Sequence, residues 1–165
     1  LEFRRVLFRS KKEASSSIKE LANGGFQTVI PEVDALEPKD VQRVVACCGK
    51  VYYDLISRRR EERLDNVAVI RIEQLYPFPH KQFAAEMKRY PNAREVVWCQ
   101  EEPQNMGAWY SSQHHMLNVI WKHKPNLALL YAGREASASP AAGYGALHNK
   151  ELEQFLKAAF EIKQK

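Results

Sequence analysis

Six polar side chains with the potential for chemistry stand where an apolar run of the chain stops. They are Lys50, Arg71, Glu73, Gln100, Glu101 and Arg134. Short β-branched runs bounded by polar residues are typical of buried strands. In an open α/β sheet, ligands and partners gather beyond the carboxyl ends of the strands. We therefore take these six residues as candidate regulatory or interface positions.

Each candidate cation also has a structural interpretation. Lys50 follows a strand and Gly49 and begins a helix, where a phosphate can bind. However, neither GxGxxG nor GxxxxGK[ST] occurs, and a tight strand-to-helix turn explains the same residues. Arg71 and Glu73 point to one side of a strand, so they can pair with each other, contact a neighbouring domain or bind a ligand. Arg134 can clamp an acidic group or form an interdomain salt bridge.

Two adjacent pairs resemble reactive groups without having the required arrangement. Glu101 and Glu102 stand in a predicted strand-end loop and need not face one substrate, so we expect structural or interface use. His114 and His115 lie about 100° apart on a predicted helix, whereas zinc-binding helical pairs use three- or four-residue spacing. We therefore assign no catalytic, cofactor-binding or metal-ligating residue to this chain.

Composition excludes several classes of protein. The chain has 165 residues, of which 45% are hydrophobic and 27% charged, as in ordinary globular domains. No run reaches the roughly 18 apolar residues of a membrane span. The net charge of +5 includes an arginine run, 58–60, that is followed at once by two glutamates, so it predicts a mixed helix surface rather than nucleic-acid binding. Three cysteines are too few for a secreted disulfide scaffold and suit a reducing compartment.

We divide the chain into three parts. Residues 1–10 have the character of a foreign, translated cloning segment, and we exclude them from fold reasoning. Residues 11–40 read as part of a preceding segment with a short helix capped at Ser17, an edge strand and an exposed linker rich in proline and acids. Residues 41–165 form the main domain.

The main domain alternates strands with helices, which predicts crossover units and a mainly parallel sheet. The fold class is therefore three-layer α/β/α, with the early strand at 26–30 antiparallel at the edge. Proline 79 opens the second helix of the domain, and Asn105 is a plausible N-cap of the third. The predicted strands are 43–48, 67–72, 95–99 and 127–131, and the predicted helices are 50–63, the segment from 79, 105–121 and 147–160.

Four ordered segments carry a family resemblance: CGKVYYDL (48–55), RIEQLYPFPH (71–80), WCQEEPQNMGAWY (98–110) and YAGREASASPAAGY (131–144). Together they resemble the C-terminal region of the thiamine-diphosphate-dependent decarboxylating component of 2-oxoglutarate dehydrogenase. The similarity extends from about residue 17 to about residue 160. It implies a transketolase C-terminal-domain-like fold.

The resemblance also implies the chemistry of a larger parent enzyme. Such a parent binds thiamine diphosphate and Mg²⁺, decarboxylates 2-oxoglutarate in the tricarboxylic acid cycle, and passes the succinyl group to a lipoyl group on dihydrolipoyl succinyltransferase. It is a homodimer, with AMP or acetyl-coenzyme A as candidate effectors, in the bacterial cytoplasm or the mitochondrial matrix. The Gly-Asp-Gly motif of the magnesium site is absent here, so we expect this fragment alone to be inactive and to bind neither group.

Three alternatives remain open. The first is the same domain of a 2-oxoadipate dehydrogenase. The second is a free-standing module that binds a nucleotide or an acyl-coenzyme A. The third is a pure assembly domain, which would present an exposed apolar face.

Overall fold

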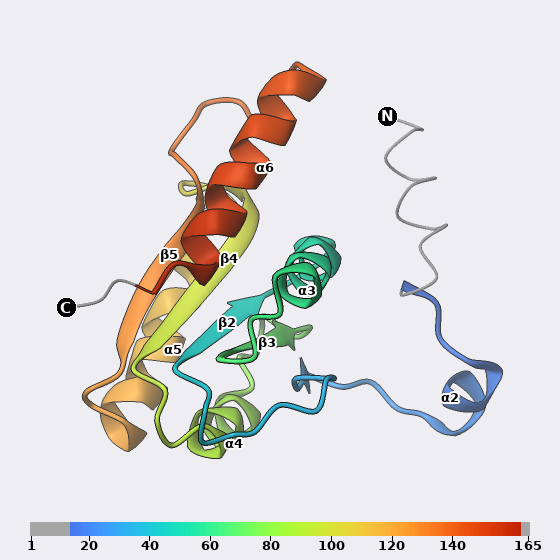
Figure 1. The fold of residues 1–165 in the computed structure, drawn as a ribbon, viewed down its shortest axis with the longest axis vertical. Coiled ribbons are helices and arrows are strands. Elements are labelled where there is room, and N and C mark those ends of the chain that lie inside the picture. The colour runs from blue at the N-terminus through green and yellow to red at the C-terminus, as the bar shows by residue number, and fades with distance from the viewer. Residues whose placement is uncertain (1–13, 163–165) are drawn as a thin grey trace.

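A five-stranded sheet forms the centre of the protein (Figure 1). The structure is a computed structural model that describes residues 14–162. The strand order is β1-β3-β2-β4-β5; β1 is antiparallel to β3, and the other neighbours are parallel. This arrangement confirms the mainly parallel sheet with an antiparallel edge strand. The strands are β1 (Val29–Ile30), β2 (Arg43–Cys47), β3 (Val67–Ile72), β4 (Glu95–Pro103) and β5 (Ala128–Arg134).

Helices cover both faces of this sheet, which confirms the three-layer α/β/α class. One core joins α4 and α5 to one face of the strands, and the other joins α3 and α6 to the opposite face. The strands supply alternate residues to the two cores: Val44 and Ala46 of β2 enter the first, and Val45 and Cys47 enter the second. The helices are α2 (Ile18–Asn23), α3 (Val51–Glu62), α4 (His80–Arg89), α5 (Trp109–His123) and α6 (Gly145–Phe160).

The short helix α2 precedes the sheet and stands away from it in Figure 1. Its capping box is confirmed, because the Ser17 hydroxyl accepts from the Glu20 N–H at 3.2 Å and the Glu20 carboxylate accepts from the Ser17 N–H at 2.7 Å. No residue of α2 is buried. The predicted foreign segment, residues 1–10, lies outside the described residues, and the division at residue 40 stays a prediction.

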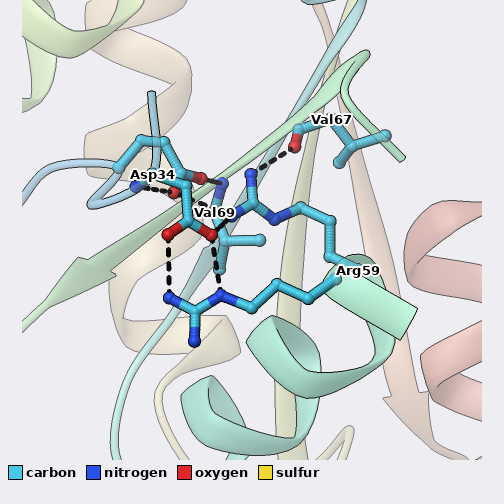
Figure 2. Close-up of polar contacts among 6 residues, drawn as sticks. Asp34, Arg59, Val67 and Val69 are labelled. Carbon is cyan, nitrogen blue, oxygen red and sulfur yellow. Dashed lines mark hydrogen bonds and ion pairs between the residues drawn. The ribbon is translucent and has the colours of Figure 1, made fainter. Parts of the chain in front are cut away.

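The segment after β1 was expected to be an exposed linker, and this expectation is wrong at Glu32. The Glu32 side chain is only 6% exposed. Its Oε2 accepts from the Val69 N–H at 2.7 Å, and its Oε1 accepts from Arg59 Nη2 at 3.0 Å. Arg59 also contacts Asp34 and donates to the Val67 carbonyl at 3.5 Å (Figure 2). Buried ionic groups of this kind hold the segment against β3 and α3.

Two predicted boundaries are corrected around β4. The strand continues to Pro103 instead of ending at Cys99, with an irregularity in its pairing to β5 over that stretch. The following helix begins at Trp109 with Ala108 as its N-cap, so Asn105 is not the cap. Asn105 instead bonds the backbone of Ser137 in both directions, at 3.0 and 2.9 Å. Long-range contacts therefore replace the predicted helical turn.

Candidate functional site

Strand register brings most of the candidate residues to one end of the sheet, where the parallel strands finish. Cys47 of β2 lies beside Arg71 of β3 on one side and beside Cys99 of β4 on the other. Because these strands are parallel, the residues that follow them emerge at the same carboxyl end of the sheet. Lys50, Glu73 and the 100–101 pair therefore lie around one end of the sheet, as the sequence predicted.

Lys50 is placed by the turn between β2 and α3. Gly49 has a positive φ of 71°, a conformation that glycine adopts readily, and Lys50 is the N-cap residue of α3. The Lys50 ammonium contacts Asp54 at 2.6 Å and Glu101 at 3.0 Å. Burial opposes its charge, but the hydrogen bond to Asp54 and the charge of Glu101 prevail, so the pKa of Lys50 is raised. The cation thus joins α3 to β4.

Arg71 lies in a setting of one carboxylate and two phenol rings. Its Nε is 2.7 Å from Glu73 Oε1, and the N–H direction makes this an ion pair rather than a hydrogen bond. Its Nη1 donates to Tyr53 Oη at 3.0 Å, and its guanidinium carbon lies 4.7 Å from the centre of the Tyr52 ring. Burial raises the pKa of Tyr52 to about 12 and keeps that phenol neutral. Internal pairing is thus the observed use of the Arg71–Glu73 couple.

Gln100 lies inside the protein rather than on the candidate surface. It is 1% exposed. Its Oε1 accepts from the Trp98 indole at 2.8 Å and the Trp109 N–H at 3.0 Å, and its Nε2 donates to the Met106 carbonyl at 2.8 Å. Nε2 is also within 3.2 Å of the carbonyls of Glu102 and Pro103. The amide therefore fixes the turn from β4 to α5 and has no free group for a ligand.

The two glutamates after Gln100 do not form a carboxylate pair. They are consecutive strand residues, so their side chains point to opposite faces. Glu101 meets Lys50, whereas Glu102 is exposed. The loop expected at this position is absent, because β4 includes both residues. Their environments give no acid–base pair facing one substrate.

Arg134 ends β5 and pairs within the domain. Its Nε donates to Glu151 Oε2 of α6 at 2.7 Å, and its Nη1 donates to the Pro140 carbonyl at 3.3 Å. The salt bridge therefore holds the loop from β5 to α6 against its own helix. Neither an external acid nor a second domain is needed to satisfy this arginine.

The cysteines near this edge are poor nucleophiles. Cys47 and Cys99 are buried, and burial raises the pKa of both thiols. Burial, with the charges of Glu102 and Glu73, raises the pKa of Cys48 to about 11. A thiol is reactive as the thiolate, so these groups are protonated and inert near neutral pH.

Three histidines lie close together on the side of the sheet that α4 and α5 cover. The ring centres of His114 and His115 are 3.9 Å apart, and those of His80 and His115 are 5.0 Å apart. His115 also stacks on Phe78. Within residues 14–162, however, no group of three or more histidine, cysteine, aspartate or glutamate side chains is arranged to hold a metal ion.

Sequence reasoning missed the residues that satisfy the candidate cations. Asp54 was detectable, because it stands four residues after Lys50 on a helix, which is a pairing distance. Tyr52 and Tyr53 lie in the segment CGKVYYDL (48–55), but nothing local indicates that both contact Arg71. The observed arrangement is a surface of paired charges that can make polar contacts.

Comparison with known proteins gives the family of the chain. The model of the family described as "2-oxoglutarate dehydrogenase C-terminal" matches residues 15–160. The chain belongs to this family.

Proteins named as 2-oxoglutarate dehydrogenase E1 component share much of this C-terminal sequence. The Azotobacter vinelandii relative is 54% identical over 151 residues, which is 92% of this chain and 16% of the relative. The Cupriavidus necator relative is 54% identical over 149 residues, which is 90% of this chain and 15% of the relative. The chain thus spans about a sixth of the length of the relatives it matches. No helix in residues 14–162 combines the length and the apolarity of a membrane span.

Proposed function

We propose that this domain is the C-terminal part of a 2-oxoglutarate dehydrogenase decarboxylating component. The parent would decarboxylate 2-oxoglutarate and pass the succinyl group to a lipoyl group on the succinyltransferase component. One observation carries this proposal: 54% identity to an E1 component over 92% of the chain. Because the E1 relatives of known origin named above are bacterial, we place the parent in the bacterial cytoplasm.

The residues of this chain do not fit the expected cofactor. The Gly-Asp-Gly motif is absent from the sequence, and the described residues offer no cluster able to hold Mg²⁺. The partly buried cations Lys50 and Arg71, at the carboxyl end of the sheet, already pair with carboxylates and so provide no open site for a diphosphate. We therefore propose that other parts of the parent bind thiamine diphosphate and Mg²⁺, and we assign no chemical step to this domain.

The role that we assign to the domain is architectural: it supports the cofactor-binding parts and helps to form the homodimer. Its two apolar cores pack helices against both faces of the sheet, and the paired charges around Lys50 and Arg71 offer a polar surface for a neighbouring domain. A nucleotide or acyl-coenzyme A effector would have to displace Glu101 or Glu73 from these cations. Calorimetry with AMP and with acetyl-coenzyme A tests that alternative directly.

A chimeric enzyme tests the proposal. Residues 15–160 replace the aligned C-terminal part of the Azotobacter vinelandii relative, and NADH formation from 2-oxoglutarate is measured in the reconstituted complex. We expect activity from the chimera and none from the relative truncated at the same point. A folded chimera without activity would contradict the proposal. The same assay on the full parent with 2-oxoadipate separates the two candidate substrates.

A further inference from the structure

The two edges of the sheet are finished in different ways. On the β1 side, the outward groups of β3 are used: β1 pairs with its carboxyl half, Glu32 accepts from Val69, and Arg59 donates to Val67. Figure 2 shows the Arg59 guanidinium reaching the Val67 carbonyl. A two-residue edge strand with charged side chains beside it is a poor template for further pairing.

On the other side, the backbone of β5 is open. β5 pairs only with β4, and the Ala128 N–H points to that side, because it donates to the Arg94 carbonyl at 2.9 Å. Peptide groups alternate in direction along a strand, so the N–H and C=O groups of Leu129 and Tyr131 point outward. Among residues 14–162, no backbone or side-chain partner meets them. In Figure 1, β5 forms the free margin of the sheet.

The sequence of β5 also lacks the features that block edge pairing. From Ala128 to Gly133 it contains no charged residue and no proline, and Leu130 is 38% exposed. Charged side chains, proline and very short edge strands are the usual protection of such an edge. An unprotected edge of this length is a template for another strand.

We propose that the outer edge of β5 pairs with the β5 strand of a second copy, antiparallel and about a two-fold axis. The inference rests on the homodimer of the proposed function and gives it a location. Leu129 of one copy lies opposite Tyr131 of the other, and each such pair exchanges its N–H and C=O groups. Two five-stranded sheets thereby become one continuous sheet.

Symmetry and charge favour a second copy over a foreign strand. An edge that pairs with itself about a two-fold axis is self-complementary, because the same residues face each other twice. The paired stretch is neutral, so no like charges meet in it. Antiparallel pairing also sends Arg134, the one charge of the strand, to opposite ends of the two copies.

A matched pair of variants tests this inference. Leu129→Pro removes the leucine side chain and one outward N–H, while Leu129→Ala removes only the side chain; both keep the ladder to β4. Sedimentation of the 165-residue chain over a concentration series is the measurement. We expect a reversible dimer for the wild type and for Leu129→Ala. For Leu129→Pro we expect a dimer dissociation constant about tenfold higher. Circular dichroism checks that each variant is folded.

The outcomes separate the edge from the function. A folded Leu129→Pro protein that dimerises as tightly as Leu129→Ala overturns the β5 edge and leaves a homodimer in place. A wild-type chain that stays monomeric also overturns the edge, while the chimera decides on the enzyme independently. If Leu129→Pro does not fold, hydrogen exchange on the wild type decides. The amides of Leu129 and Tyr131 must become protected as concentration rises, and unchanged exchange overturns the inference.

Discussion

Arg43 and Glu95 form a cross-strand ion pair, and Arg43 also donates to the last carbonyls of a helix. They are register partners at the amino ends of β2 and β4, and Arg43 Nη2 lies 2.6 Å from Glu95 Oε2. Arg43 is 2% exposed, and its Nη1 donates to the carbonyls of Ala158 and Ala159 at 3.1 and 2.9 Å. The last carbonyls of a helix lack partners within the helix, so one guanidinium joins two strands to the end of α6.

Replacing this arginine is expected to destabilise the domain strongly. Arg43→Met keeps much of the apolar volume but leaves the Glu95 carboxylate and two helical carbonyls without their donor. We expect the free energy of unfolding to fall by about 3 kcal/mol, as for other broken buried pairs. Urea unfolding followed by circular dichroism measures the change.

Arg60 provides the control for this prediction. It is exposed, and it pairs with Asp34, which keeps Arg59 as a second partner. Arg60→Met is expected to cost less than about 1 kcal/mol, because exposed ion pairs contribute little. Equal losses for the two methionine variants would show that the Arg43 pair has no special weight.

The carboxylate of Glu32 is expected to stabilise the β3 edge. Glu32→Gln replaces one of the two carboxylate oxygens with an NH2 group, which cannot accept a hydrogen bond. The side chain can then no longer accept from both the Val69 and the Asp34 N–H groups. We expect a loss of about 1–3 kcal/mol in the free energy of unfolding, the usual effect of an unsatisfied buried group. Hydrogen exchange at the Val69 amide is the local measurement, and it should accelerate.

Glu37→Gln is the matched control, since Glu37 lies in the same segment and is exposed. It should leave both the stability and the Val69 exchange unchanged. If Val69 exchanges at the same rate in all three proteins, the side-chain closure of this edge is not what protects the strand.

The centres of the elements were predictable from local patterns, and their ends were not. The run Val67–Ile72 is a strand over its whole predicted length, because it is bounded by polar residues and buried on both faces. The extension of β4 to Pro103 depends on pairing with Arg134, which is distant in sequence. Asn105 fits the N-cap preference, but its amide is used by Ser137, 32 residues away.

The candidate site divides in the same way. The pairing of Arg71 with Glu73 follows from the two-residue period of a strand, so it was among the predicted alternatives. The contact of Lys50 with Glu101 requires β2 and β4 to be neighbours, which no local pattern gives. The buried position of Gln100 depends on the turn from β4 to α5, which its side chain stabilises. That turn could not be predicted locally, so the polar residue type alone suggested a position on the surface.

That turn gives a third prediction, at Gly107. This residue has a φ of 64°, and an added Cβ would lie 2.9 Å from Gln100 Nε2 and 3.0 Å from Oε1. Gly107→Ala therefore combines backbone strain with displacement of a buried amide, and we expect a loss of about 1–3 kcal/mol. Thermal unfolding measures it. Gly143→Ala, where an added Cβ meets nothing within 4 Å, should be neutral, and a neutral Gly107→Ala would contradict the prediction.

Asp34 gives a prediction about pH. The hydrogen bond from Arg60 outweighs burial and, with the charges of Arg59 and Arg60, lowers the pKa of Asp34 below its ordinary value of 3.8. A carboxylate with a lowered pKa in the folded state stabilises the protein above its unfolded pKa. That contribution disappears as the pH falls through the folded pKa.

The stability difference between the wild type and Asp34→Asn should therefore be constant near neutral pH. It should shrink as the pH falls below 3.8, because the wild-type carboxyl then becomes neutral as well. Urea unfolding at a series of pH values measures this difference. Asp40→Asn is the control, because the Asp40 carboxylate is exposed and has no ion pair among residues 14–162. A difference for Asp34→Asn that grows toward acid pH would mean that the arginines do not favour the charged form.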